Sequence, residues 1–155
     1  MLTTVCLGIT SCTAEHDPIT LFEAGKYAEA FDLFSERATS GDPQAANYLG
    51  IHYYIGAGVE RDFLRSAAWF EVGALTGAAT AQKNLGVMYY RGLGVEQDYY
   101  RAYGWMYFAY KGGNTEARNY LELMQFSVTP NASEKAVGMI REQLRSQDKE
   151  IEINR

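Results

Sequence analysis

The chain has 155 residues, of which 47% are hydrophobic and 21% are charged, so it can fold as one domain with a buried core. Its formal net charge of −5 argues against a nucleic-acid partner, because nucleic acids require a basic surface. No segment reaches the roughly 18 apolar residues of a spanning helix. The two histidines and two cysteines lack metal-ligand spacing, so we expect no metal and no cofactor.

Residues 1–12 are apolar or small and end in a cysteine. The tetrapeptide ITSC at residues 9–12 fits a bacterial lipoprotein box, in which lipid is attached to the cysteine. We therefore expect a signal-like segment over 1–12, lipidation of Cys12, and a periplasmic chain anchored to the outer membrane, since Thr13 and not aspartate follows the cysteine. No lysine or arginine lies near Met1 and the apolar run is short, so a true start further upstream and a cytoplasmic leader stay open as alternatives.

The central part of the chain repeats itself at an offset of 36 residues. This offset gives 13 identities over the 34 residues from Leu49 to Gln82, and the register extends back to Tyr27 and forward to Leu121. A repeat of this length indicates an array of stacked supersecondary units.

Each period predicts two helices. In the second period, the apolar residues of the first helix recur with the 3.6-residue period at Ala81, Leu85, Met88 and Tyr89. Gly92 then suits a helix C-cap with positive φ, and Asp98 suits the N-cap of the next helix, as Asp62 does one period earlier. Glycine inside a helix costs roughly 1 kcal/mol relative to alanine, so the repeated Gly50 and Gly86 indicate close helix packing.

The recurring motif reads A-x-x-x-L-G-x-M-Y-x-x-G-x-G-V-x-x-D-Y, followed by a tryptophan and a later glycine. Residues 81–113 give it as AQKNLGVMYYRGLGVEQDYYRAYGWMYFAYKGG, and a poorer copy, with His52 in place of the methionine, precedes them. This motif resembles the Sel-like repeat, a relative of the tetratricopeptide repeat, over roughly residues 41–118. The resemblance implies an all-α fold, an α/α solenoid of about four antiparallel helix pairs wound as a right-handed superhelix.

We expect a single Sel-like repeat domain over residues 17–145. Its predicted parts are a leading pair at 17–40, full repeats at 43–77 and 79–113, a closing pair at 114–145, and a frayed tail at 146–155.

No catalytic constellation is evident. No serine or cysteine stands in a nucleophile motif, and a second histidine that would complete a relay with His52 is lacking. The carboxylate pairs recur at turn and cap positions, as Glu60 with Asp62 and Glu96 with Asp98, so structure explains them. We expect a protein that is not an enzyme, with a hydrolase that uses His52 as the least favoured alternative.

Two sets of residues are candidates for contact with another protein. In tetratricopeptide-like arrays the first helices line the concave groove, which places one set there: Ile51, Tyr54, Ile55, Val87, Tyr90 and Arg91. Stacking between neighbouring units is the alternative for this set. The other set is a stripe on the second helix of the last full repeat at Tyr100, Tyr103, Tyr107 and Tyr110, for which packing on the following helix pair is the alternative.

The resemblance also implies a class of function. Sel-like repeat proteins serve mostly as scaffolds and adaptors, and a subset are small envelope lipoproteins. Some of these resemble immunity proteins that hold a type VI secretion toxin, such as a phospholipase, inactive in the periplasm. We therefore expect a secreted effector as the partner, with a general scaffold for envelope or cell-wall machinery as the alternative. The negative charge of the chain would complement a basic effector surface.

Overall fold

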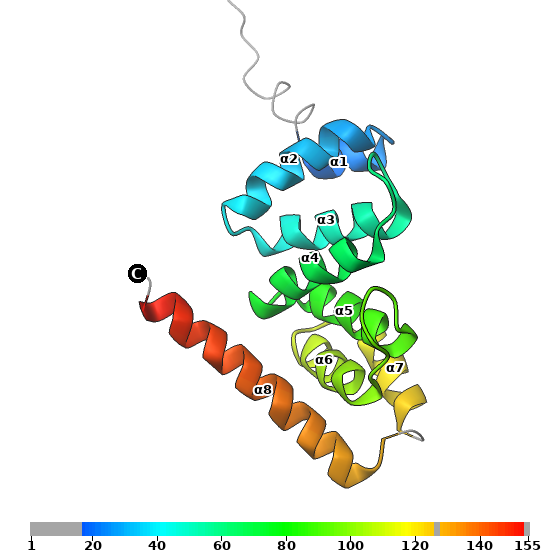
Figure 1. The fold of residues 1–155 in the computed structure, drawn as a ribbon, viewed down its shortest axis with the longest axis vertical. Helices are drawn as coiled ribbons and strands as arrows, with labels where there is room; N and C mark the ends of the chain where they lie inside the picture. The colour runs from blue at the N-terminus through cyan, green and yellow to red at the C-terminus, as the bar shows by residue number, and fades with distance from the viewer. Residues whose placement is uncertain (1–16, 126–127, 154–155) are drawn as a thin grey trace, which may run out of the picture.

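The computed structural model describes residues 17–125 and 128–153 and confirms the all-α fold. Over these residues the chain forms eight helices and no strand (Figure 1). The helices are α1 (Pro18–Glu23), α2 (Tyr27–Thr39), α3 (Pro43–Ile55), α4 (Phe63–Leu75), α5 (Ala79–Arg91), α6 (Tyr99–Lys111), α7 (Glu116–Met124) and α8 (Pro130–Ile153). The lipoprotein box and Cys12 lie outside the described residues.

Aspartate side chains cap the helices at the positions that the repeat predicts. Asp62 Oδ1 accepts a hydrogen bond from the backbone N–H of Arg65 at 3.0 Å. Asp98 Oδ1 accepts two, from the backbone N–H groups two and three residues ahead, at 2.9 and 3.0 Å. At the end of α5, Gly92 takes the left-handed conformation with φ of 68°. The predicted caps are thus confirmed, and they fix where each repeat helix begins and ends.

Consecutive helices pack against one another and form a column. It runs from α1 and α2 at one end to α6 and α7 at the other, with α3–α4 and α5–α6 as the two pairs of the repeated motif (Figure 1). This arrangement is the α/α solenoid that the periodicity predicts.

The buried apolar side chains fall into two clusters. The smaller cluster joins α1, α2 and α3, and Trp69 of α4 packs against it while partly buried. The larger cluster joins α4 to α8 and contains Trp105, which is fully buried. The leading pair α1–α2 therefore has a core distinct from that of the main array.

The repeated glycines lie where two helices come close together. A Cβ atom on Gly50 would be 2.9 Å from Cγ of Phe70, and one on Gly86 would be 3.0 Å from Cε of Met106. Ser66 Oγ also donates to the Gly50 carbonyl at 2.8 Å, which ties α4 to α3. The packing reason that the sequence predicts for these glycines is confirmed.

The C-terminal helix differs from the prediction in two ways. The frayed tail expected over 146–155 is wrong for residues 146–153, because α8 continues to Ile153. In addition, α8 packs mainly on α6 and reaches α4, where Gln143 Nε2 donates to Glu71 Oε1 at 3.3 Å, so it is not the second helix of a closing pair on α7. The physical reason is Gly104 of α6, whose missing side chain leaves room for Ile140 of α8.

Candidate protein-binding surfaces

The first helices of the array bring one predicted set of residues together. We call this surface the first-helix face; it comprises Ile51, Tyr54 and Ile55 of α3, Val87, Tyr90 and Arg91 of α5, and Leu123 of α7. Ile55 is 52% exposed and Leu123 is 62% exposed, whereas the tyrosines and the other aliphatic residues are half-buried against the larger cluster. The face therefore offers partly exposed apolar side chains on a packed base.

Polar contacts link neighbouring first helices along this face. Arg91 Nη1 donates to Tyr54 Oη at 3.4 Å, which joins α5 to α3. On the same two helices, Asn84 Nδ2 donates to Asn47 Oδ1 at 2.9 Å. Lys83 Nζ lies 3.1 Å from Glu116 Oε2 and joins α5 to α7. These contacts hold the first helices in fixed register, so a partner would meet a surface that is already ordered.

The aromatic side chains of this face are partly exposed and also pack against neighbouring rings. Tyr54 lies 5.4 Å from Phe63, and one repeat later Tyr90 lies 5.5 Å from Tyr99, measured between ring centroids. The ring of Tyr90 also lies 6.3 Å from that of Tyr120 of α7. These ring contacts lie within and between repeats, and both tyrosines stay half-buried.

The excess of negative charge lies away from the first-helix face. Residues 17–42, which hold α1 and α2, carry six carboxylates and only two cations. The helices α3, α5 and α7 carry three cations and two carboxylates, and two of the cations are paired, as Lys83–Glu116 and Arg118–Glu122. A basic partner would be attracted to the leading pair, and an apolar partner segment to the first-helix face.

The tyrosine stripe lies on a different surface, beside α8. Tyr100 lines a hollow of about 460 Å³ together with Lys135 and Met139. Tyr103 and Tyr107 line a second hollow of about 380 Å³, whose other walls are residues of α8. The structure therefore places these three tyrosines beside α8 and apart from the first-helix face. Tyr100 remains 51% exposed, whereas Tyr103 and Tyr107 are half-buried.

Sequence reasoning missed a pair of equivalent hollows at the loops within the repeats. One, of about 460 Å³, includes Tyr53 and Arg65, and the other, of about 450 Å³, includes Tyr89 and Arg101. The Arg65 guanidinium lies 5.6 Å from the Tyr53 ring centroid, and that of Arg101 lies 5.4 Å from Tyr89. The sequence does contain a signal for these hollows, because both the tyrosine and the arginine of each pair recur at the 36-residue offset.

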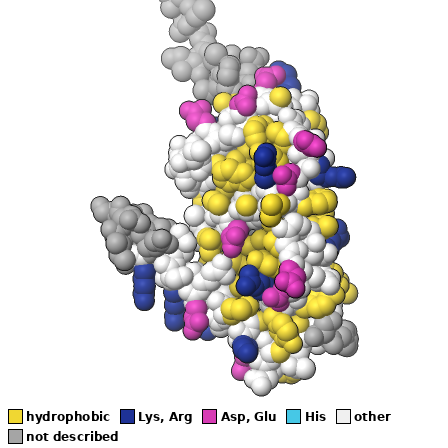
Figure 2. Space-filling view, in the orientation of Figure 1, with side chains coloured by type: hydrophobic (Ala, Val, Ile, Leu, Met, Phe, Trp, Pro, Cys, Tyr) yellow, Lys and Arg dark blue, Asp and Glu magenta, His cyan; other side chains and the backbone are white. Residues whose placement is uncertain are grey.

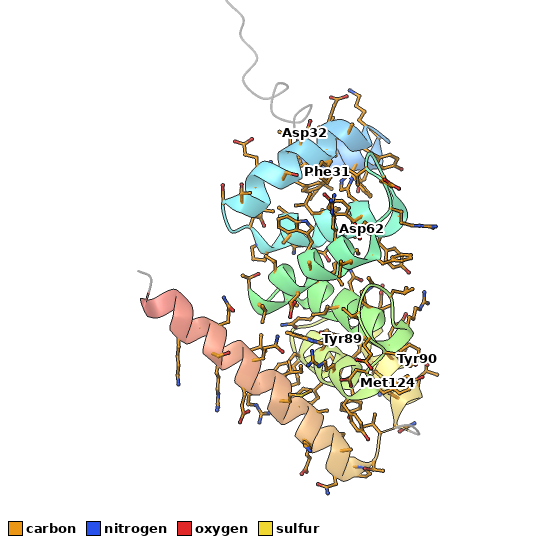
Figure 3. The ribbon with its side chains drawn as sticks, viewed as in Figure 1. Phe31, Asp32, Asp62, Tyr89, Tyr90 and Met124 are labelled. Carbon is orange, nitrogen blue, oxygen red and sulfur yellow. The ribbon has the colours of Figure 1, made fainter. Side chains whose placement is uncertain are left out.

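Each arginine in these hollows is held by its surroundings. Arg101 Nη1 donates to Tyr89 Oη at 3.1 Å, and its Nε lies 3.5 Å from Asp98 Oδ2. The hydrogen bond to Tyr89 and the nearby charge of Asp98 raise the pKa of Arg101 above its ordinary value. Figure 3 labels Asp62, which lines the first hollow, and Tyr89, which lines the second. In the same orientation, Figure 2 shows apolar side chains gathered in patches beside basic and acidic ones.

His52 is buried and does not lie on a surface. Its exposed fraction is 0%, and rings of α1 and α2 surround it. A substrate in solution has no access to this imidazole, which removes the basis for a hydrolase that uses His52.

Two further features are absent from the residues that the structure describes. Across residues 17–125 and 128–153, no three His, Cys, Asp or Glu side chains are grouped to hold a metal ion. In the same part of the chain, no helix combines the length and the apolar character needed to cross a membrane.

Comparison with known protein families gives a match over the central helices. The Sel1 repeat matches residues 43–75 and 79–114, which contain α3–α4 and α5–α6. Two segments of the chain therefore match the Sel1 repeat. A comparison with curated proteins gives no significant match.

Solved structures are also similar to this chain. A Sel1 repeat protein from Oxalobacter formigenes has a TM-score of 0.67 and 28% identity, over 71% of this chain and 45% of its own. The antigen c5321, described as a protective antigen present in uropathogenic Escherichia coli strains displaying an SLR fold, has a TM-score of 0.72 and 25% identity, over 87% of this chain and 31% of its own. This chain thus spans less than half of either relative, and both support the Sel1 repeat fold.

Proposed function

We propose that the chain is a non-catalytic protein-binding module whose contact surface is the first-helix face. The observation that carries this proposal is the partly exposed apolar strip of α3, α5 and α7, with Ile55 and Leu123 more than half exposed on helices that polar contacts hold in register. Apolar side chains that stay exposed on an ordered surface are typical of protein interaction sites. Sel1 repeat proteins generally mediate protein–protein contacts, which agrees with this use.

Within this class, the best-supported specific role is that of a periplasmic immunity lipoprotein that neutralises a secreted effector, such as a phospholipase of a type VI secretion system. Two features support it: the lipoprotein box ending at Cys12, and the acidic leading pair, which would speed encounter with a basic effector. A general scaffold for envelope or cell-wall machinery is the second candidate, and the same first-helix face would serve it.

A matched pair of substitutions tests the contact surface. Ile55 on the first-helix face is 52% exposed and Leu64 on α4 is 69% exposed, so Ile55→Asp and Leu64→Asp each add a charge without disturbing a buried site. Affinity capture from bacterial envelope extract with the wild-type chain identifies the partner by mass spectrometry. We expect Ile55→Asp to lose that partner and Leu64→Asp to retain it. Equal binding by both variants would remove the first-helix face from the proposal.

The identity of the partner separates the two roles. Recovery of one toxin near one-to-one, with its activity suppressed by the wild-type chain but not by Ile55→Asp, supports the immunity role. Recovery of several cell-wall proteins and no toxin supports the scaffold.

The anchor is tested separately by labelling with a fatty-acid analogue and by cell fractionation. Cys12→Ser should abolish the label and release the chain from the membrane fraction. An unlabelled wild-type chain in the cytoplasm would contradict the envelope location.

A further inference from the structure

His52 occupies a position where the repeat otherwise has a methionine. Its equivalent at the 36-residue offset is Met88, and both side chains are fully buried. Met88 fills its site with apolar atoms, whereas His52 brings two ring nitrogens into the core. The leading pair α1–α2 therefore packs on a polar, titratable group that the next repeat does not have.

Only one of the two ring nitrogens has a partner. Nδ1 lies 2.6 Å from the Ala57 carbonyl oxygen, and because a carbonyl oxygen can only accept, Nδ1 carries the proton and donates. In the neutral ring, Nε2 then carries a lone pair, and it has no hydrogen-bond partner among the described residues. The site thus accommodates the neutral imidazole and offers no acceptor for a second proton.

Aromatic rings of the leading pair surround the imidazole. Phe22 of α1 lies 5.0 Å away, and Phe31, Phe34 and Tyr27 of α2 lie 5.5, 5.8 and 6.5 Å away, all between ring centroids. Burial among these rings removes water from the imidazole and so disfavours its charged form. Burial lowers the pKa of His52 below its ordinary value near 6.5, and the hydrogen bond to Ala57 opposes part of this shift.

The charged groups on the surrounding elements do not reach the imidazole. Tyr27 is the titratable side chain of α2 that faces it, and Tyr48 lies one turn earlier on α3 and stacks on Phe34. The ionisable groups of α1, α2, their caps and the loop after α3 are exposed or half-exposed at the surface: Asp17, Glu23, Lys26, Glu29, Asp32, Glu36, Arg37, Glu60, Arg61 and Asp62. Burial and the Ala57 carbonyl therefore govern the proton affinity of His52.

The hydrogen bond from His52 also fixes the loop that touches α2. Ala57 accepts this bond, and the next residue, Gly58, lies so close to α2 that a Cβ on it would be 2.7 Å from the Tyr27 carbonyl carbon. Because α1, α2 and α3 share a core cluster separate from that of the main array, this junction can open while α4–α8 stay packed.

We propose that His52 is an acid-sensitive latch: protonation of its buried imidazole releases α1–α2 from α3 and exposes the apolar side of α3, while the rest of the array stays folded. In the open state the imidazole regains its ordinary pKa near 6.5, so between the two pKa values the open state binds more protons. The closed state is therefore fully favoured above about pH 6.5 and is weakened as the pH falls, by at most about tenfold per pH unit.

Hydrogen exchange with mass spectrometry on the full chain tests the latch, with rates corrected for the intrinsic pH dependence of exchange. Between about pH 7.5 and about pH 5.5, protection of 18–39 should fall by up to about tenfold per pH unit below 6.5, while protection of 79–111 stays unchanged. His52→Met, which restores the residue type of the next repeat, should remove the pH response. His16→Gln, which removes the other histidine, should leave it intact.

A second variant guards against a folding defect. His52→Gln does not titrate and can still donate to the Ala57 carbonyl, so it takes the place of His52→Met if the latter is already unprotected at about pH 7.5. The latch is overturned if protection of 18–39 is the same at both pH values, if both His52 variants keep the full response, or if 79–111 opens together with 18–39.

Discussion

Ile140 of α8 lies over Gly104 of α6, at a point where α6 has no side chain of its own. Ile140 is fully buried there, and a Cβ on Gly104 would be 2.9 Å from the Ala136 carbonyl oxygen. The equivalent position one repeat earlier is Ala68 of α4, which is exposed. The single missing methyl group thus marks the helix on which α8 docks.

Gly104→Leu should dislodge α8, because the new side chain would occupy the space of Ile140. We expect a loss of about 1–3 kcal/mol in the docking of α8, measured as reduced exchange protection over 130–149 with α3–α5 unchanged. Ala68→Leu, at the exposed equivalent position, should change stability by less than about 0.5 kcal/mol. Full protection of α8 in Gly104→Leu would show that docking does not depend on this contact.

Gly94→Ala should cost more stability than Gly77→Ala. Both glycines have positive φ, 69° and 91°, so an alanine at either site pays about 1–2 kcal/mol of backbone strain. A Cβ on Gly94 would also collide with the backbone of Phe63 at the start of α4, whereas one on Gly77 would meet nothing within 4 Å. Urea unfolding of both variants measures the difference, and equal costs would mean that the loop moves away from α4 without penalty.

Asp98→Ala should destabilise the chain by about 0.5–2 kcal/mol, since α6 loses a cap that accepts two backbone hydrogen bonds. Asp98→Asn keeps an acceptor oxygen and should cost much less. Glu96→Ala, at an exposed carboxylate in the same loop, is the control and should be near neutral in thermal unfolding. A similar loss for Asp98→Ala and Glu96→Ala would point to loop charge as the cause.

Asn84→Ala should cost about 1–3 kcal/mol, because it leaves the Asn47 side chain, only 3% exposed, without its donor. Removing both partners should cost less than the sum of the single changes, as is usual for two groups in direct contact. A double-mutant cycle by chemical denaturation measures this coupling. Additive losses would show that the two side chains act independently.

The solenoid could be predicted from the sequence because each repeat encodes its own boundaries. Asp62 and Asp98 start the second helices, Gly92 ends a first helix, and Gly50 and Gly86 set the close contacts between them. These signals act over a few residues and recur with the period, so one sequence is enough to recognise them.

The placement of α8 and the tyrosine stripe could not be predicted in the same way. The glycine at position 104 has no counterpart in the preceding repeat. The packing of Ile140 against it is a contact between distant segments that no periodicity encodes. With α8 placed on α6, Tyr100, Tyr103 and Tyr107 border that helix and do not join the first-helix face. The unpaired nitrogen of His52 was equally hidden, because its hydrogen bonding depends on the loop at Ala57.

The two tryptophans of the chain are divided between the two core clusters, Trp69 against the smaller and Trp105 within the larger. Each cluster therefore carries its own intrinsic fluorophore. In a Trp105→Phe chain the emission would report on the packing of α4 against the smaller cluster, and in a Trp69→Phe chain on the packing of α6 within the array. Stopped-flow fluorescence of the two variants would thus time the assembly of the two ends of the array separately, without any added label.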